Sequence, residues 1–411
     1  MVVGLDIGTS CIRVAIGNED TSGDFKIAGT ASEKSVGLRN GNIVNIEAVS
    51  NAIKNAIENA EQNAGAEVRS CFTTIGGDQI EGLNATGKVA VSTQGKSQRE
   101  ISQGDIDRVR ECAQAVPTSL GRERLHTITQ EYIVDGVGGI KDPMHRLGVC
   151  LEASVHIITA SSTTIQNLRA CINRAGYIMD GVMLKTLAAA HAVATEDEME
   201  LGSILIDLGA GTTDFLVILN GAPVCTASIP VGGNMVTNDI VLMKGISSAE
   251  AERIKVESGC CWMPDIVQDE EVVFSRGSQP DKLLKSELCE IIMARMEEIF
   301  TMVKLKIMDK TSFTRLSGNI ILTGAGAAMN GVEELVQNIF KTSAVRIGQP
   351  GKHGGIEDDY AGSEWATAIG LVLACKGSGS TRDSKKPRKV HSVEKESGGD
   401  NPIAKFFKSL F

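Results

Sequence analysis

Residues 203–214, SILIDLGAGTTD, carry the strongest fold signal in the chain and continue as FLVIL to residue 219. An apolar strand ends in an aspartate and a leucine, a Gly-rich tip follows, and a second apolar strand begins directly after the tip. The same design occurs near the start of the chain, where VVGLDI (2–7) and IRVAI (12–16) flank the tip GTS (8–10). This internal repeat predicts two copies of one hairpin in an α/β protein.

The two tips have the chemistry of a phosphate site. Two Gly-rich turns that face one another offer backbone N–H groups from both sides to phosphate oxygens, and glycine lets the main chain approach closely. Asp6 and Asp207 are placed to flank a hydrated Mg²⁺, an ion that keeps several waters and takes few protein carboxylates. A lone Asp-x-Gly-Thr is typical of a β-turn, and its repetition is what favours phosphate binding. The tip residues expected at the phosphates are Gly8, Thr9, Ser10, Gly209, Gly211, Thr212 and Thr213.

Two further motifs each permit two interpretations. The run Gly324, Ala325 and Gly326 follows a predicted strand at 319–323 and precedes a predicted helix at 331–340. It is either a tight turn or a loop that brings backbone and a helix N-terminus to a nucleotide. Glu252 and Lys255 share one face of a predicted helix at 248–257, either as a solvated ion pair or as groups that close over a ribose and base.

Composition limits the class of protein. A chain of 411 residues exceeds one ordinary core, which stops growing near roughly 250–300 residues, and 42% apolar with 22% charged residues is typical of folded domains. The net charge of −10 argues against a surface devoted to nucleic acid. Ten cysteines without C-x-x-C spacing indicate small apolar core residues in a reducing cytosol, with redox sensing by Cys260 and Cys261 as the lesser alternative. We expect no signal peptide and no membrane-spanning helix.

Apolar periodicity predicts the remaining elements. Helices are expected at 48–64, 102–115, 281–309 and 365–375, and strands at 70–75 and 150–158. Residues 83–156 are expected to form an insert. In the helix at 281–309, Arg295 falls within an apolar stripe that includes Leu284.

The order of these motifs resembles the actin, sugar-kinase and Hsp70 superfamily. Finer matches, in residues 142–159, 229–240 and 251–255, resemble the FtsA family of bacterial cell-division proteins. The resemblance implies an actin-like, ribonuclease-H-like duplicated α/β fold with two lobes around a nucleotide cleft and an inserted α+β subdomain. The expected parts are a first lobe (1–82, 157–200 and the closing helix 365–375), the insert (83–156), a second lobe (201–234 and 320–364), its small subdomain (235–319), a linker (376–400) and a terminal helix (401–411).

The family resemblance also implies ligands and partners. ATP with Mg²⁺ is expected in the cleft, with Gly233 and Asn234 added to the nucleotide-binding residues. The partners implied are other copies of the chain in actin-like filaments, other division proteins, and the C-terminal peptide of the tubulin-like FtsZ on residues 235–319. Arg295 is the candidate contact for that acidic peptide, and an internal ion pair with Glu298 or another acid is the alternative.

Hydrolysis is expected to be slow or absent. Related proteins place a Glu-Pro pair before a small-residue helix to position the attacking water, and the matching stretch here is LKTLAAA, residues 184–190. Lys185 cannot replace that acid, although its cation has access to phosphate or to solvent.

The last residues predict a membrane anchor. Residues 376–411 carry nine Lys or Arg against four Asp or Glu, and 376–400 contain almost no apolar side chain. In 401–411 one helix face is wholly apolar and two cations lie away from it, a pattern typical of an interfacial helix on an anionic membrane. The alternative is a helix that docks on protein. The membrane-binding candidates are Ile403, Phe406, Phe407, Leu410 and Phe411, with Lys405 and Lys408.

Taken with these features, the resemblance to the FtsA family implies an ATP-binding protein that polymerises and tethers the FtsZ ring to the inner face of the cytoplasmic membrane at the division site. A pilus-assembly scaffold of similar architecture is one alternative. A small-molecule kinase is another, and it has no use for an apolar tail.

Overall fold

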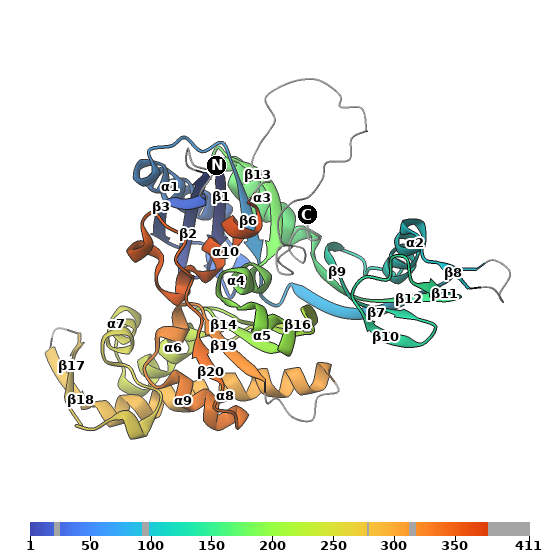
Figure 1. Cartoon of the computed structure of the whole chain (residues 1–411). Coiled ribbons are helices and arrows are strands. Elements are labelled where there is room, and N and C mark those ends of the chain that lie inside the picture. Colours follow the sequence, from blue (N-terminus) through green and yellow to red (C-terminus); the bar gives the residue numbers. More distant parts are fainter. Residues whose placement is uncertain (20–24, 93–97, 278, 312–317, 377–411) are drawn as a thin grey trace.

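Two five-stranded sheets form the two halves of the molecule (Figure 1). The computed structural model describes residues 1–19, 25–92, 98–277, 279–311 and 318–376. The sheets have the strand orders β13-β6-β1-β2-β3 and β16-β15-β14-β19-β20. In each, a hairpin pairs on one side with an antiparallel strand and on the other with two parallel strands. The repeat seen in the sequence is therefore a repeat of the whole sheet, which confirms the actin-like duplicated α/β fold.

The first lobe is built on the first sheet. Its elements are β1 (Val2–Ile7), β2 (Cys11–Glu19), β3 (Phe25–Lys34), β4 (Leu38–Arg39), β5 (Asn42–Ile43), α1 (Ile46–Ala64), β6 (Ser70–Ile75), α3 (Ser162–Arg174) and β13 (Ile178–Leu184). Residues 2–6 of β1 are buried in succession, as expected of a strand that is covered on both faces. α1 packs on β2 and β3, and the C-terminal helix α10 (Ala366–Ala374) packs on β1 and β2.

The second lobe repeats this plan. Its elements are β14 (Ser203–Leu208), β15 (Thr213–Leu219), β16 (Ala222–Ile229), β19 (Asn319–Thr323), α9 (Val332–Phe340) and β20 (Val345–Ile347). All six residues of β14 are buried, with Ile204, Ile206 and Leu208 in the core of the second lobe and Leu205 in the core of the first.

The helices α4 (Lys185–Val193) and α10 lie between the two sheets. α4 follows β13 directly and packs against α10, with the short α5 (Glu196–Leu201) after it. A Cβ at Gly370 would lie 1.7 Å from the Ala188 carbonyl oxygen, so only glycine permits this helix crossing. The crossing fixes Lys185, the first residue of α4, at the edge where the two lobes meet.

The insert projects from the first lobe as an arm (Figure 1). Its elements are β7 (Ile80–Ala90), β8 (Arg99–Glu100), α2 (Gln103–Gln114), β9 (Arg122–Val134), β10 (Val137–Ile140), β11 (Leu147–Gly148) and β12 (Cys150–Ser161). β7 and β12 pair over almost their whole length and extend beyond residues 83 and 156. A small core of its own, which includes Ile106 and Val109 of α2, supports the sheet.

The arm is hydrogen-bonded to the second lobe although the chain joins it to the first. Asn84 Nδ2 donates to the Val224 carbonyl at 2.9 Å, and Gln130 Nε2 donates to the Pro223 carbonyl at 2.8 Å. The buried His156 lies with Nδ1 2.6 Å from Asn84 Oδ1 and Nε2 3.0 Å from Thr226 Oγ1. Edge strand β16 thereby obtains partners for carbonyl groups that its own sheet leaves unpaired.

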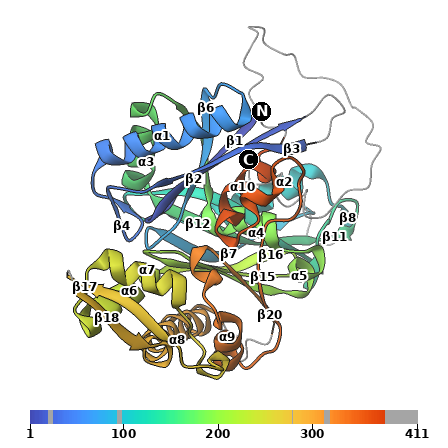
Figure 2. The ribbon, with the colours of Figure 1, turned by 90° about the vertical axis from the view of Figure 1, so that its left-hand side faces the viewer.

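A small helical subdomain lies beneath the second sheet (Figure 2). It contains α6 (Gly233–Lys244), α7 (Ser248–Ser258), β17 (Glu271–Arg276), β18 (Gln279–Leu284) and the long α8 (Lys285–Lys310). The prediction of a helix from residue 281 is wrong by one turn, because residues 279–284 pair with β17 in a hairpin. Leu284 consequently leaves the predicted apolar stripe and is 45% exposed.

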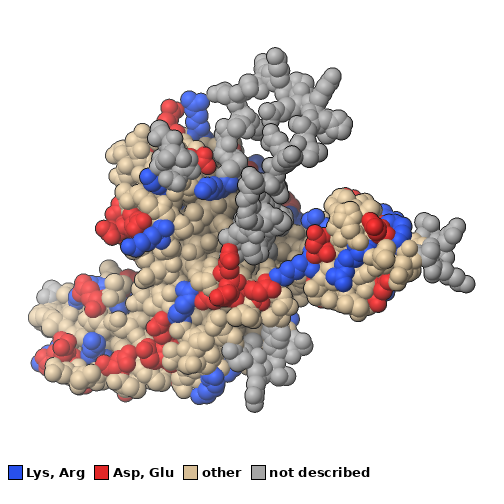
Figure 3. Space-filling model, viewed as in Figure 1, with Lys and Arg blue, Asp and Glu red and all other residues tan. Residues whose placement is uncertain are grey.

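Charged side chains of both signs are interspersed over the face of the molecule that Figure 3 shows. One pair on the surface joins the arm to α5, where Lys141 Nζ contacts a carboxylate oxygen of Glu200. Mixed charge of this kind is typical of an ordinary solvated surface.

Cysteines and membrane spans complete the comparison with the sequence. All ten cysteines are free thiols, and seven of them are buried, as expected of small core residues. Within the described ranges, no helix combines the length and apolarity that a bilayer crossing requires. The predicted linker beyond residue 376 and the terminal helix at 401–411 lie outside the described residues.

Candidate functional site

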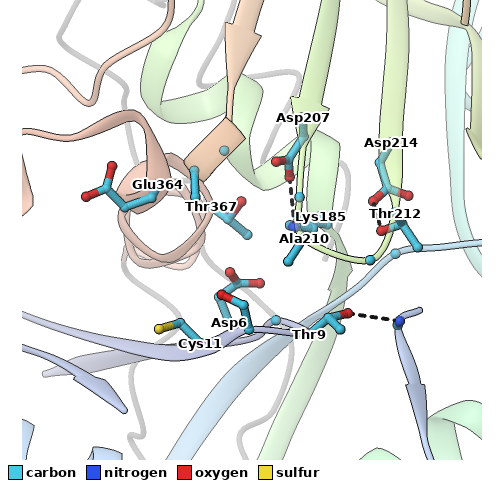
Figure 4. Close-up of a pocket in the computed structure, with 18 of the residues that line it drawn as sticks. Asp6, Thr9, Cys11, Lys185, Asp207, Ala210, Thr212, Asp214, Glu364 and Thr367 are labelled. Carbon is cyan, nitrogen blue, oxygen red and sulfur yellow. Dashed lines mark hydrogen bonds and ion pairs between the residues drawn. The ribbon is translucent and has the colours of Figure 1, made fainter. Parts of the chain in front are cut away.

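The two hairpin tips fold in the same way and face one cleft. Gly8 N–H donates to the Cys11 carbonyl at 3.1 Å, and Gly209 N–H donates to the Thr212 carbonyl at 3.0 Å. The cleft between them has a volume of about 650 Å³, its open mouth included, and both Asp6 and Asp207 line it (Figure 4). The two tips are thus opposed across one cavity, as the repeat predicts.

Three buried carboxylates line the floor of this cleft, each with different partners. Asp6 Oδ1 accepts from Thr74 Oγ1 at 2.8 Å. Asp214 Oδ1 accepts from Gly77 N–H at 2.7 Å, a bond between the lobes, and its Oδ2 accepts from Thr212 Oγ1 at 3.0 Å. Among the described residues, Asp207 accepts no hydrogen bond from a hydroxyl or a backbone N–H, and its partner is the Lys185 ammonium.

Lys185 supplies the missing counter-charge of Asp207. Its Nζ lies 3.1 Å from Asp207 Oδ2, and the side chain is 17% exposed. Burial alone lowers the pKa of Lys185, but the charges of Asp207 and its two acidic neighbours outweigh burial, so the pKa is raised. Burial raises the pKa of Asp207, and the nearby ammonium opposes that rise. The sequence left phosphate or solvent as possible contacts of the Lys185 cation. In the structure this cation contacts Asp207 and lines the cleft.

The loop after β19 completes the cleft beside Asp207. Gly324 has φ +82°, in the region that favours glycine, and a Cβ there would lie 2.3 Å from Asp207 Oδ1. The residues that follow form a short 3₁₀ turn, Ala325–Ala328, and α9 begins only at Val332. The predicted helix N-terminus is therefore not joined directly to the Gly324 loop.

A second compartment of about 760 Å³ continues from the first and shares Ser10, Gly209, Ala210 and Ala325 with it. Glu252 and Lys255 line this compartment. Lys255 Nζ donates to Glu252 Oε2 at 2.7 Å and to Thr237 Oγ1 at 3.0 Å, and Lys255 is buried. The two residues form an ion pair, but Lys255 is buried and the pair is not the solvated surface pair of the first interpretation. The pair lies at the cleft, where the second interpretation requires it.

Most of the predicted nucleotide residues line one of the two compartments, and two do not. Thr213 turns its hydroxyl away and donates to the Val231 carbonyl at 2.8 Å. Asn234 lines neither compartment in the described structure, and its N–H donates to the Ala210 carbonyl at 2.8 Å. The residues that line the cleft as predicted are Asp6, Gly8, Thr9, Ser10, Asp207, Gly209, Gly211, Thr212, Gly233, Glu252, Lys255, Gly324, Ala325 and Gly326.

Several residues that line the cleft have no role in the sequence-based prediction. Asp214 is one of them, and its place directly after the second tip is the signal that could have identified it. Cys11 and Arg13 follow the first tip, and the others lack a motif because they reach the cleft from separate parts of the chain. The residues without a predicted role include Cys11, Arg13, Gly41, Gly76, Glu364, Thr367 and, in the second compartment, Val236, Met296 and Asn330.

The donor set is suited to a hydrated cation. No group of three or more acidic, His or Cys side chains in the described ranges is arranged to hold a metal directly. Asp207 nevertheless offers a buried Oδ1 that accepts no hydrogen bond, its Oδ2 contacts only the Lys185 ammonium among the described residues, and Asp6 lies across the same cleft. Carboxylates in this arrangement can accept hydrogen bonds from the waters of Mg²⁺.

Arg295 is held inside the small subdomain. Its Nε donates to Asp239 Oδ2 at 2.6 Å, and a second guanidinium nitrogen contacts Glu298. The side-chain hydrogen bond that Arg295 donates to Asp239 raises the pKa of Arg295, so the residue stays charged. Arg295 therefore makes the internal ion pair that the alternative interpretation held.

The duplicated sheets and the cleft between them define the class of protein, which is the actin-like class with two lobes around a shared cavity. Solved structures share this fold. The PilM-PilN type IV pilus biogenesis complex has a TM-score of 0.64 at 14% identity, covering 90% of this chain and 97% of that one. MreB5 of Spiroplasma citri bound to ADP has a TM-score of 0.52 at 13% sequence identity, and the match covers 92% of this chain and 96% of that one. The MamK double helical filament has a TM-score of 0.50 at 14% sequence identity, and the match covers 90% of this chain and 98% of that one.

Sequence comparison gives the family within this class. The family model for cell division protein FtsA matches residues 204–370, and the model for the SHS2 domain inserted in FTSA matches residues 77–159. Cell division protein FtsA of Borreliella burgdorferi is 36% identical over 415 residues, covering 100% of this chain and 98% of that protein. FtsA of Pseudomonas aeruginosa is 36% identical over 375 residues, covering 91% and 88%. The chain belongs to the FtsA family of cell-division proteins.

Proposed function

We propose that this division protein binds ATP between its two hairpin tips, assembles with copies of itself, and tethers the FtsZ ring to the inner face of the cytoplasmic membrane. The observation that carries the proposal is the single cleft between two similar turns. Residues of both turns, among them Ser10 and Gly211, line one space, to which their backbone and hydroxyl groups can donate. A triphosphate fits such a space because it can accept hydrogen bonds from both sides at once.

The second compartment is proposed to hold the ribose and base. Its lining combines apolar side chains such as Val236 and Met296 with the Glu252 and Lys255 pair. A mostly apolar pocket with a few polar groups is typical of nucleotide and cofactor sites. MreB5, which shares the fold, was solved with ADP, which supports a nucleotide here.

Mg²⁺ is proposed to be held through its waters by Asp6 and Asp207. When bound, the ion would neutralise part of the phosphate charge. The chain's own residues then position the nucleotide and exclude solvent. We expect slow or absent hydrolysis, because Lys185 stands where related proteins have a water-positioning acid and cannot accept a proton from water.

Self-assembly and membrane attachment are proposed to act together. The fold is shared with the MamK filament, which supports an actin-like assembly. The anchor rests on the sequence of residues 401–411 alone, where three of the ten phenylalanines cluster on one predicted face. A short amphipathic helix binds weakly, and many helices on one filament bind tightly because the later contacts become intramolecular.

The FtsZ peptide is proposed to dock on the small subdomain beside Arg295. Met235 and Leu242 flank Asp239 on one face of α6, and they are 36% and 80% exposed. An acidic, apolar peptide would compete with Asp239 and Glu298 for the guanidinium and cover these side chains. We expect Arg295→Ala to weaken binding of the peptide. Arg253→Ala is the matched control, because Arg253 is paired with Glu250 and Glu257 on α7.

Liposome sedimentation tests the proposal as a whole. The full chain and a chain ending at residue 400 are compared on anionic vesicles, each with ATP and without. We expect only the full chain, and not the chain ending at residue 400, to sediment with the vesicles. A larger fraction of the full chain should sediment when ATP is present. Equal sedimentation of both chains refutes the anchor, and a missing ATP effect refutes the coupling of nucleotide to assembly.

The alternatives have weaker support. The likeness to the pilus complex is a likeness of fold at 14% identity, whereas the FtsA relatives match nearly the whole chain at 36%. Release of ADP that depends on a sugar would favour the kinase alternative.

A further inference from the structure

Lys185 occupies an unusual place for a cation. It is the first residue of α4, and no side chain caps that helix N-terminus. A helix N-terminus carries partial positive charge and disfavours Lys by about 0.3–1 kcal/mol. The residue is also largely buried, which adds to the cost of its charge. A side chain that conflicts with its local structure in this way is expected where a functional site requires it.

The topology shows what Lys185 faces. β6 pairs in parallel with the central strand β1, and β13 pairs in parallel with β6. The carboxyl ends of the three strands therefore meet at one edge of the sheet. Lys185 follows β13 and Gly76 follows β6, and both line the cleft between the tips. A Cβ at Gly209 would lie 3.7 Å from Lys185 Nζ, so the ammonium lies directly beside the second tip.

The charges around Lys185 are unequal. Two of the three buried carboxylates have hydrogen-bond donors of their own, and only Asp207 depends on Lys185. A phosphate chain that enters the cleft would add negative charge to a floor that already holds three carboxylates. Some cation must offset that charge, and Lys185 is fixed in place for this role.

We infer that Lys185 is a built-in counter-ion for the terminal phosphates, which gives this chain an ATP affinity that depends only weakly on Mg²⁺. Its ammonium leaves Asp207 in part and donates to a phosphate oxygen beside the second tip. The divalent ion then adds to the binding and is not required for it. This inference rests on the proposed ATP site and names how that site is charged.

The test is fluorescence titration of the full chain with an N-methylanthraniloyl derivative of ATP, in excess Mg²⁺ and in EDTA. For the unaltered chain we expect affinity to fall by less than about tenfold in EDTA, since tenfold corresponds to about 1.4 kcal/mol. For Lys185→Gln we expect a fall of more than about 100-fold in EDTA and a much smaller loss in Mg²⁺, because the ion then replaces the missing charge. Lys185→Arg keeps the charge and is expected to retain most of the binding in EDTA.

Lys255→Gln is the matched control. Lys255 is a second buried lysine of the same cleft, but it lies in the compartment proposed for the base and is paired with Glu252. Its loss should weaken binding by the same factor with and without the metal. Circular dichroism melts show whether each variant is folded.

The outcomes separate the two proposals. Tight binding of the unaltered chain in Mg²⁺ but none in EDTA overturns the counter-ion role and leaves the ATP site standing. Equal losses for Lys185→Gln in both conditions also overturn it. No binding in either condition refutes the ATP site itself. Should Lys185→Gln fail to fold, the EDTA titration of the unaltered chain and of Lys185→Arg still decides the question.

Discussion

The two halves of the duplicated scaffold differ at the carboxylate that ends each central strand. In the first half Thr74 donates to Asp6. In the second half Thr323 pairs in register with Asp207, but its hydroxyl donates to the Ser363 carbonyl at 2.9 Å. Asp207 is consequently left to Lys185, a residue from the other side of the cleft.

The strands opposite these aspartates differ as well. Arg13 lies opposite Asp6, whereas Asp214 lies opposite Asp207. The first half therefore balances its charge within one hairpin, and the second half has two acids whose partners, Lys185 and Gly77, belong to the first half. One duplicated fold has thus acquired a self-contained side and a side that links the lobes.

The largest effect is expected where the second half requires glycine. The residue after Thr323 is Gly324, whereas the residue after Thr74 is Ile75. Gly324→Ala adds a Cβ that collides with Asp207 and places alanine at φ +82°, a strain of about 1–3 kcal/mol. We expect ATP affinity to fall by more than about 100-fold in a calorimetric titration.

Gly65→Ala is the control for Gly324→Ala. Gly65 has φ +61°, and a Cβ added there would meet no other atom within 4 Å, so only backbone strain changes. A small loss of stability with unchanged ATP affinity is expected. Equal losses of affinity in the two variants would show that strain, and not contact with Asp207, explains the effect.

The next effect concerns the residues opposite the two aspartates. Asp214→Ala leaves the Gly77 N–H unpaired at the lobe junction, and we expect a loss of about 2 kcal/mol in the free energy of unfolding. Relief of repulsion with Asp207 offsets part of the cost. Arg13 lies over the Trp365 ring at 5.8 Å, and Arg13→Ala should cost about 0.5–1 kcal/mol. Urea denaturation measures both, and a larger loss for Arg13→Ala would reverse the comparison.

A smaller effect is expected from the two threonines. Thr74→Val removes the donor to Asp6 and should cost about 1–2 kcal/mol, with weaker binding of ATP in Mg²⁺. Thr323→Val removes a bond to a main-chain carbonyl and should cost about 1 kcal/mol with no change in ATP affinity. If Thr323→Val weakens ATP binding as much as Thr74→Val does, the two halves do not differ in the way described.

A separate effect is a dependence on pH at the arm. Burial lowers the pKa of His156 from its ordinary 6.5 to about 4, and Lys310 adds to the shift. Below pH 6.5 the unfolded chain binds a proton at this position that the folded chain does not. Stability should therefore fall by up to about 1.4 kcal/mol per pH unit from pH 6.5 down to about 4 on account of His156.

His156→Gln isolates this contribution. The slope of unfolding free energy against pH reports the number of protons taken up on unfolding, and in the variant that number should be smaller by about one between pH 6 and pH 4.5. His191, whose pKa burial also lowers to about 4, lies at α4 and provides a comparison away from the arm. An unchanged slope in His156→Gln would show that the arm's junction does not resist protonation.

Much of the fold could be predicted because the signals are local. The repeated hairpins, the helix at 48–64 and the strand at 319–323 all have strong apolar patterns, and the structure confirms them. The start of α8 could not be placed from the sequence, because the apolar pattern of Asp281 to Leu284 fits both a helix and a strand. The pairing of these residues with β17 makes them a strand. Tertiary pairing overrides propensity at such borders.

The site could be predicted only in part. The tips and Asp6 and Asp207 follow from the repeat, but the link from Lys185 to Asp207 depends on a helix crossing that no motif records. Thr213 does not line the cleft, because neighbouring residues of an extended chain point to opposite faces: the Thr213 hydroxyl donates to the Val231 carbonyl, and Thr212 takes the side that faces the cleft.

The most direct test of the central claim is a crystal structure of the chain with a non-hydrolysable ATP analogue and Mg²⁺. The account predicts one nucleotide per chain, with its phosphates in contact with backbone N–H groups of residues 8–11 and of residues 209–212, and with Lys185 in hydrogen-bond distance of a phosphate oxygen. A nucleotide that contacts only one tip, or that lies outside the cleft between them, would contradict it.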